Sequence, residues 1–292
     1  MKRSFCIASF VAGCVATPIA AQVGRDDAPV LRARHAVSGL QAKVFNPVGA
    51  VRLVGWDKDS IVVRGRVVPG HRFYFGGTDS AIKFGLEERG DGKAGGRSDL
   101  VAYVPRRSQV SLKTVTGDIT ASDVSGWFYT VSGDVRLSGT ASTVEVQSIS
   151  GNVDLNVVTP WVHARTGDGN LLVRGEPQDV DASTIGGTLS IASSTILRGQ
   201  FGSVSGDIQY AASPAAGGIF DFSNHSGAIE FLLARSVSGV FSLSSIIGAI
   251  ENGFSQVRPI ASTPQSIRLS FGRGGAQITA RTFKGAIRLR PQ

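Results

Sequence analysis

Acidic and amide side chains recur at one position of a repeated phrase, directly after a glycine. Carboxylates on neighbouring turns of such a repeat could bind a cation or process a carbohydrate. Asp and Asn are also favoured turn residues, and the calcium-binding pattern Gly-Gly-x-Gly-x-Asp is absent from the sequence. We therefore predict that the side chains of this row stabilise turns, and we assign no catalytic residue, no metal site and no cofactor. The row consists of Asp118, Asp134, Asn152, Asn170, Thr188, Asp207, Ala228, Ala249 and Ala286.

The histidines and tryptophans form no recognisable site in the sequence. The histidines lack metal-ligand spacing, and neither a Gly-x-Ser-x-Gly nor a His-Glu-x-x-His motif is present. His225 precedes Gly227 by two residues, which predicts an inward, packed side chain. Tryptophans can stack on sugars, but we expect these three to pack in the core or in loops. The residues concerned are His35, His71, His163 and His225, and Trp56, Trp127 and Trp161.

Basic residues accumulate at the C-terminal end. No acidic residue follows Glu251, and Arg288 and Arg290 alternate with aliphatic residues, which places both on the outward face of a strand. One interpretation is a solvated edge that blocks end-to-end association. The other is a patch of Arg281, Arg288 and Arg290 that attracts anionic envelope polymers or lipid headgroups. The basic residues are Arg258, Arg268, Arg273, Arg281, Lys284, Arg288 and Arg290.

The phrase that carries the acidic row recurs with a nearly constant period. It consists of a small polar residue, a glycine, a polar or small residue and an aliphatic residue. Successive glycines are 16, 18, 18, 18, 19, 21 and 21 residues apart, a regularity typical of stacked repeats. These glycines are Gly117, Gly133, Gly151, Gly169, Gly187, Gly206, Gly227 and Gly248, with a late copy at Gly285.

Aliphatic residues fall two positions before, two after and four after the glycines, as at Val131, Val135 and Leu137. This alternation predicts strands with one buried face. We predict an all-β chain, a parallel β-solenoid with rungs of about 18–21 residues behind an N-terminal β cap. In it the glycines from Gly117 to Gly206 line up at one corner of successive rungs. An antiparallel meander or sandwich is the alternative, because two strands joined by Gly-Asp also form a hairpin.

Residues 1–21 form a predicted export signal. Two basic residues precede an apolar stretch too short to span a membrane, and cleavage is expected after Ala21. The alternative is a lipoprotein, because residues 11–14 resemble a lipobox that would anchor the chain through Cys14. The only other cysteine, Cys6, also lies in the signal, so a mature chain cleaved after residue 21 has no disulfide. The remaining sections are a polar leader at 22–43, a β cap at 44–109 with an irregular stretch at 70–98, and the repeats at 110–292.

Short motifs spread along the chain carry a family resemblance. Residues 46–51 (Asn-Pro-Val-Gly-Ala-Val), 55–57 (Gly-Trp-Asp) and 62–65 (Val-Val-Arg-Gly) stand near the start, and residues 101–105 (Val-Ala-Tyr-Val-Pro) precede the Ser-Gly-Asp phrases. Together they resemble the bacterial family of putative adhesins, which has a β-strand-repeat domain of unknown function. The resemblance covers about Val44 to Arg290 and implies an exported, β-solenoid-like envelope protein. It offers no catalytic residue to carry over.

These observations predict a non-enzymatic exported protein of the envelope, a scaffold or an adhesin-like surface-interaction module. It would be periplasmic, on the outer surface or secreted, with an envelope polysaccharide, lipid headgroups or an envelope protein as partner. Nucleic acid is excluded as a partner, because the basic residues lack interleaved aromatics and the chain is exported. The alternative is a carbohydrate-active lyase or hydrolase on a β-helix, which needs a cleft with convergent carboxylates or a basic residue across neighbouring rungs. The oligomeric state stays open.

Overall fold

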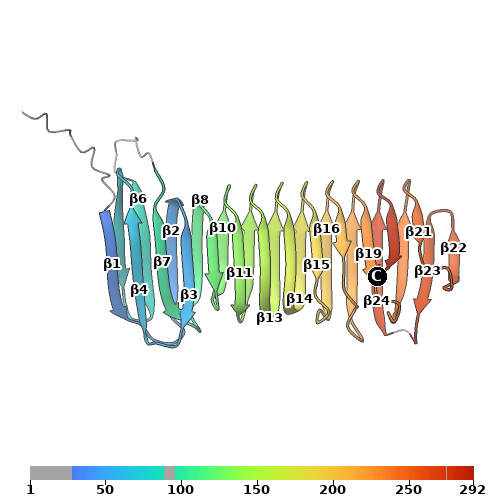
Figure 1. Cartoon of the computed structure of the whole chain (residues 1–292), viewed down its shortest axis with the longest axis horizontal. Helices are drawn as coiled ribbons and strands as arrows, with labels where there is room; N and C mark the ends of the chain where they lie inside the picture. Colours follow the sequence, from blue (N-terminus) through green and yellow to red (C-terminus); the bar gives the residue numbers. More distant parts are fainter. Residues whose placement is uncertain (1–27, 89–95, 274) are drawn as a thin grey trace, which may run out of the picture.

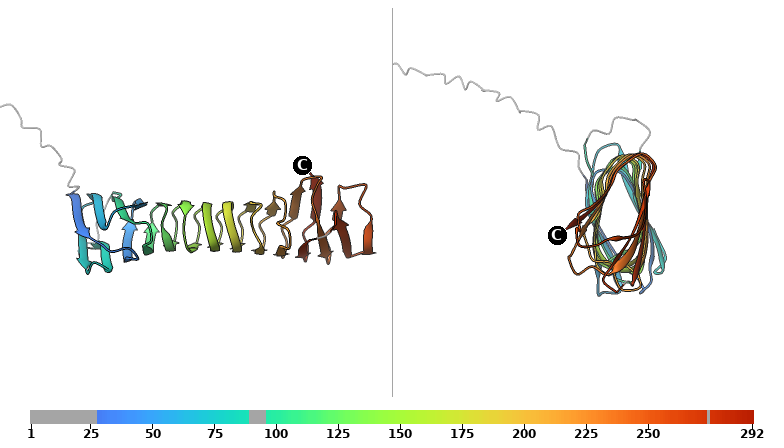
Figure 2. Two further views of the ribbon diagram at one scale, coloured as in Figure 1. Left: turned by 90° about the horizontal axis from the view of Figure 1, so that it is seen from below. Right: turned by 90° about the vertical axis from the view of Figure 1, so that its right-hand side faces the viewer.

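The computed structural model describes residues 28–88, 96–273 and 275–292, which form one elongated stack of β-strands (Figure 1). Viewed from its end, the stack is a flattened tube with strands along two opposite sides (Figure 2). The described residues contain strands and no helix, so the prediction of an all-β chain is confirmed. Within these ranges, no helix has the length and apolar character needed to cross a membrane. The predicted signal, with Cys6 and Cys14, lies outside the described residues.

The middle of the chain forms the regular part of the stack. Each repeat contributes a strand segment before its glycine, to what we call the first face, and one after it, to the second face; β13 and β14 are continuous strands that run from the second face onto the first. Parallel pairing joins equivalent residues of successive repeats, so that Leu155 lies opposite Leu137 and Val173. The strands are β8 (Gln109–Thr116), β9 (Ile119–Ser122), β10 (Ser125–Thr130), β11 (Val135–Thr140), β12 (Val144–Ser148), β13 (Val153–Thr166), β14 (Leu171–Thr184), β15 (Leu189–Ala192), β16 (Arg198–Ser203), β17 (Ile208–Tyr210), β18 (Ile219–Asn224) and β19 (Ile229–Leu233).

Antiparallel strands flank the stack at its N-terminal end. β2 and β3 form a rung that pairs in parallel with β8 and β9 on one side and with β6 and β7 on the other. β5 then pairs antiparallel with β6, β4 with β7, and β1 with β4. The strands are β1 (Ala28–His35), β2 (Gln41–Val48), β3 (Val51–Trp56), β4 (Ser60–Val67), β5 (His71–Gly77), β6 (Ala81–Glu88) and β7 (Asp99–Pro105).

The order of the rungs departs from the order of the chain at the C-terminal end. The last rung, β24 and β25, pairs in parallel with β18 and β19 on one side and with β20 and β21 on the other. It is therefore inserted between two earlier rungs. β23 pairs antiparallel with β20, and β22 with β23, so the sheet is mixed at both ends rather than parallel throughout. The strands are β20 (Gly239–Ser245), β21 (Ile250–Asn252), β22 (Pro259–Thr263), β23 (Ser266–Phe271), β24 (Ala276–Thr282) and β25 (Ile287–Pro291).

The repeat glycines line up in one column along the stack, which confirms the predicted alignment. A Cβ atom on Gly169 would meet the carbonyl oxygen of Gly151, and the same relation holds along the column. Glycine is needed at these positions because the backbone of one rung approaches the backbone of the next so closely that no Cβ atom fits. Only Gly49 in this column also has a positive φ. The column already begins within the predicted cap, and the division into a cap (44–109) and repeats (110–292) stays a prediction. In order along the stack, the glycines are Gly49, Gly117, Gly133, Gly151, Gly169, Gly187, Gly206, Gly227, Gly285 and Gly248.

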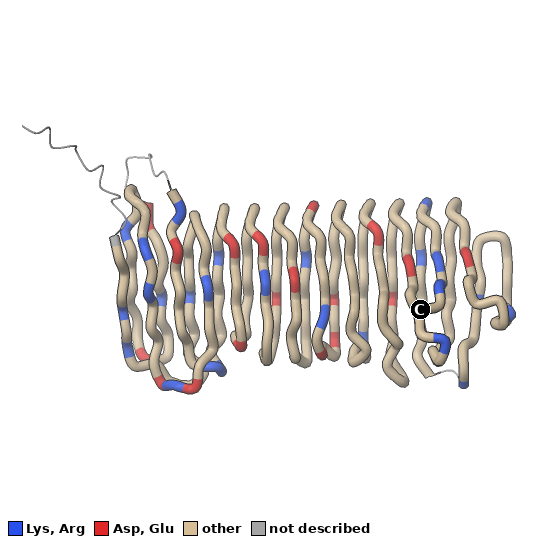
Figure 3. The backbone as a smooth tube through the Cα atoms, viewed as in Figure 1, with Lys and Arg blue, Asp and Glu red and all other residues tan. Residues whose placement is uncertain are grey.

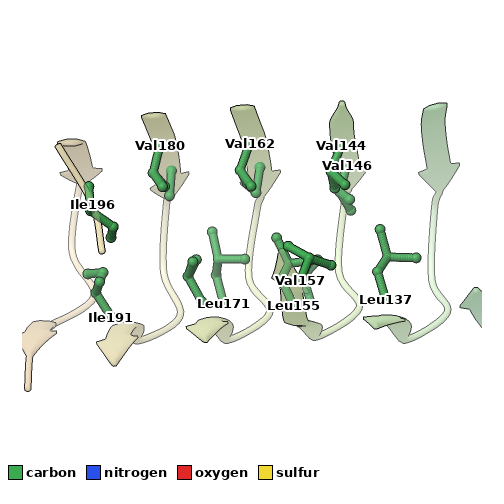
Figure 4. Packing of buried hydrophobic residues seen from close by; sticks show 14 of the residues in the cluster. Leu137, Val144, Val146, Leu155, Val157, Val162, Leu171, Val180, Ile191 and Ile196 are labelled. Carbon is green, nitrogen blue, oxygen red and sulfur yellow. The ribbon is translucent and has the colours of Figure 1, made fainter. Parts of the chain in front are cut away.

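The hydrophobic core lies between the two faces. Leu137 and Leu155, four residues after their glycines, are buried and point toward Val144 and Val162 of the first face (Figure 4). The same columns continue along the stack, because parallel pairing places equivalent aliphatic residues on top of one another. The core predicted from the positions after each glycine is therefore confirmed.

The aliphatic residues two positions before the glycines are not part of this core, which corrects the sequence prediction. Ile185, for example, is 56% exposed. The side chain three residues before the glycine points inward instead, so the alternation shifts by one residue at the corner. His225 occupies the exposed position, so its predicted inward orientation is wrong, and its ring stacks on that of Phe283 with 5.2 Å between centroids. The exposed set includes Val115, Ile149, Ile185, Val204, Ile246 and Phe283.

The inward side chain at the corner is polar in each of these rungs. Thr184 donates a hydrogen bond from Oγ1 to the carbonyl of Gly169 at 3.3 Å and accepts one from the N–H of Gly187 at 3.2 Å. Asn224 uses its amide in the same way and donates to the carbonyl of Gly206 at 2.8 Å. These bonds satisfy backbone groups that the corner would otherwise leave unpaired in the interior. The polar column consists of Asn46, Thr114, Thr130, Ser148, Thr166, Thr184, Ser203, Asn224, Thr282 and Ser245.

Candidate functional site

The row that follows the glycines forms a ladder of hydrogen bonds between rungs. Asp118 Oδ1 accepts a hydrogen bond from the N–H of Asp134 at 3.0 Å, and Asp134 Oδ1 accepts one from the N–H of Asn152 at 3.1 Å. Asn152, Asn170 and Asp207 make the equivalent bond to the next rung at 2.8 to 2.9 Å. Residues 28–88, 96–273 and 275–292 contain no group of three His, Cys, Asp or Glu residues that could hold a metal ion. The row therefore fixes the backbone at the corner.

Replacing Asp118, Asp134 and Asp207 together by asparagine is expected to leave the fold intact. Asparagine keeps the accepting oxygen, so the free energy of unfolding should change by less than about 0.5 kcal/mol per site, as measured by urea denaturation. Alanine at the same three positions is the matched comparison and should be more destabilising, because it removes the oxygen. Equal losses in the two variants, or a glycan-cleaving activity that the asparagine variant loses, would show that the row needs its charge.

Acidic residues of neighbouring rungs lie beside the three arginines of the predicted anionic-surface patch (Figure 3). The sequence does not reveal these partners, because they come earlier in the chain, by as much as 60 residues, and only the inserted last rung brings them alongside. Attraction of an anionic surface by this patch stays a prediction. The ion pairs are Arg281 with Asp221, Arg288 with Glu251 at 3.4 Å and Arg290 with Glu230 at 2.9 Å.

Carboxylates on the first face are also held in ion pairs across rungs. Asp181 lies 3.2 Å from His163 Nδ1 and 3.8 Å from Arg165. Asp179 lies 2.9 Å from Arg198 Nε. Each of these carboxylates thus has a basic partner on a neighbouring rung.

The three tryptophans have different surroundings. Trp56 donates a hydrogen bond at 2.7 Å to the carbonyl four residues later, and so closes the turn before β4, as expected for a loop-packing residue. Trp127 and Trp161 lie on the outward side of the first face, which corrects the expectation for both. Trp161 stacks on His163 with 5.7 Å between ring centroids, and Trp127 stacks on Tyr129 with 5.6 Å.

A groove of about 800 Å³ crosses the first face near its N-terminal end. Its floor follows the outward residues Lys83, Lys43 and Ser111, which lie in register on β6, β2 and β8. Trp127 on β10 continues this row on one side, and β5 borders the groove on the other with Tyr74. Four strand spacings separate β5 from β10, roughly 19 Å, so the groove suits an elongated ligand.

The charges in the groove are mainly positive. Lys43 and Lys83 are exposed side by side, and neither has an acidic partner within 4 Å among the described parts of the chain. Glu87 also lines the groove, but it pairs with Arg72 at 2.8 Å. Burial, together with the charge of Glu87, raises the pKa of Tyr74. Its hydroxyl therefore stays protonated at neutral pH and can donate a hydrogen bond.

The groove is not evident from the sequence, which predicts an irregular stretch at residues 70–98, where the structure has β5 and β6. The alternation was available as a signal, since Lys43 and Lys83 each stand between two apolar residues. The alternation does not show that the two lysines are neighbours, because β2 and β6 are far apart in the sequence and meet only through strand pairing in the folded chain. The aromatic rings and polar groups that meet here are of the kind that bind and orient small ligands.

No protein-family model matches the chain, and no curated protein matches it. Among solved structures, a putative adhesin from Bacteroides fragilis NCTC 9343 is similar, with 13% identity, a TM-score of 0.46 and coverage of 90% of this chain and 97% of that one. A putative adhesin from Parabacteroides distasonis ATCC 8503 has 10% identity, a TM-score of 0.41 and coverage of 91% and 98%. A putative lipid binding protein from the same organism has 10% identity, a TM-score of 0.39 and coverage of 89% and 96%. At these scores the similarities assign no ligand to this chain. The description of the first two proteins agrees with the family that the sequence resembles.

Proposed function

We propose that the protein is a non-enzymatic, exported envelope protein in which a β-solenoid serves as a rigid scaffold and the groove on the first face binds an envelope component. The groove carries this proposal, because it exposes aromatic and basic side chains on a surface whose backbone is fixed from rung to rung. A binding site on such a rigid element keeps its geometry without further ordering. Export rests on the signal predicted at residues 1–21.

Binding to an array of envelope polysaccharides and other glycans tests this proposal. The full chain, exported with its own leader, is expected to bind at least one polymer of the array and to leave that polymer uncleaved. Trp127→Ala should lower the affinity by about tenfold or more, because an aromatic residue that a ligand covers contributes more than ~1.4 kcal/mol at many interfaces. Trp161→Ala is the matched control, since this tryptophan lies on the same face outside the groove.

Three results would overturn the proposal. One is a folded protein that binds nothing on the array. Another is binding that Trp127→Ala leaves unchanged or that Trp161→Ala reduces by the same factor. The third is the release of shortened polymer, which would make the protein an enzyme.

A further inference from the structure

We infer that the groove binds an acidic saccharide, an oligomer whose sugar rings carry carboxylates. This inference rests on the proposed function, because it names the ligand class of the same groove. It follows from two features, the pair of lysines on the floor and the aromatic rings at the sides.

The lysine pair indicates an anionic ligand. Lys43 and Lys83 are partners in the parallel pairing of β2 and β6, so their backbones are one strand spacing apart, about 4.8 Å. Both side chains are exposed, and no described acidic residue lies within 4 Å of either ammonium group. Two like charges at this spacing repel each other, and a ligand carboxylate near both would relieve that repulsion. Glu87 does not relieve it, because its carboxylate pairs with Arg72 and lies more than 4 Å from both ammonium groups.

The remaining lining indicates a sugar rather than a lipid chain. Gln41 and Ser111 present an amide and a hydroxyl group on the floor, and an alkyl chain would leave these groups without hydrogen-bond partners. Trp127 and Tyr74 stand at opposite sides of the groove. An aromatic face suits the apolar face of a pyranose ring, and the Tyr74 hydroxyl can donate to a sugar oxygen.

Oligogalacturonate and its methyl ester form the matched ligand pair that tests the inference. The two oligomers have the same rings, and esterification replaces each carboxylate by a neutral methyl ester. Isothermal titration calorimetry with the full chain is expected to show that the acid binds at least about tenfold more tightly than the ester, the factor given by ~1.4 kcal/mol. Raising the salt concentration should weaken binding of the acid, because exposed charges are screened over about 8 Å at physiological ionic strength.

The double variant Lys43→Gln and Lys83→Gln is expected to abolish the preference for the acid over the ester. Lys58→Gln with Lys284→Gln is the matched control, since it removes two exposed positive charges outside the groove and should leave the preference unchanged. All four lysines are exposed, so both variants should melt at the temperature of the unaltered protein.

Equal binding of acid and ester, or an equal loss in the control variant, would overturn the inference. So would binding to phosphatidylglycerol vesicles without binding to any saccharide, because the ligand would then be a lipid surface. Binding of a neutral glycan that is abolished only by Trp127→Ala would contradict the inference of an acidic ligand, but it would agree with the proposed function. A folded protein that binds no envelope component at all would overturn both.

Discussion

Replacing Gly169 by alanine is expected to lower the free energy of unfolding by about 3 kcal/mol or more, in the range of severe single substitutions. The added Cβ would meet the backbone carbonyl of Gly151. Neither backbone can move away without breaking the parallel pairing of β13 with β14, in which equivalent residues from Val153 to Thr166 lie opposite their partners. A fall in the urea midpoint or in the melting temperature measures the effect.

Gly202→Ala is the matched control in the same stack. A Cβ at Gly202 would meet only side-chain atoms, at 3.7 Å, and the residue has no positive φ. The free energy of unfolding of the Gly202→Ala variant should therefore differ from that of the unaltered protein by no more than about 0.5 kcal/mol. If the two variants melted at the same temperature, the close approach would not be the reason for glycine at the corner.

Replacing Thr184 by valine is expected to cost about 1–3 kcal/mol, the usual penalty for a buried backbone group left without a partner. Valine has nearly the shape of threonine, so the change removes the hydroxyl but leaves the packing in place. The N–H of Gly187 and the carbonyl of Gly169 then lose their hydrogen-bond partner at a site where Thr184 is only 3% exposed. Urea denaturation measures the loss.

Thr184→Ser tests whether the hydroxyl is responsible. Serine keeps the oxygen and already occupies the equivalent position at Ser148, where it accepts a hydrogen bond from the N–H of Gly151 at 2.9 Å. We expect the serine variant to retain most of the stability that the valine variant loses. A serine variant as unstable as the valine variant would assign the effect to the lost methyl group.

The period, the glycine column and the core positions after each glycine were predictable from the sequence alone. The reason is that every rung repeats the same local pattern and stacks on its neighbour, so a spacing along the chain becomes a column in space. Gly133, Val135 and Leu137 illustrate this, because each lies where its offset within the repeat placed it. The all-β class followed from the same alternation.

The orientation at the corner was decided by hydrogen bonding, which the hydrophobic pattern does not report. The alternation alone predicts that Ile185 is buried. In the structure Thr184 turns inward, because its hydroxyl satisfies backbone groups of the corner, and Ile185 is exposed as a result. An unpaired interior carbonyl and an unpaired N–H cost roughly 1–3 kcal/mol each, and together they outweigh the roughly 1.5–3 kcal/mol gained by burying one aliphatic side chain.

The order of the rungs and the groove were decided only by the tertiary structure. Parallel rungs present similar edges, so the repeat pattern does not exclude the insertion of β24 and β25 between earlier rungs, which sets Arg288 beside Glu251. The groove likewise depends on β6 pairing with β2, which places Lys83 beside Lys43. Sequence periodicity determines what each rung buries, whereas non-local strand pairing determines which charged side chains become neighbours on its outer surface.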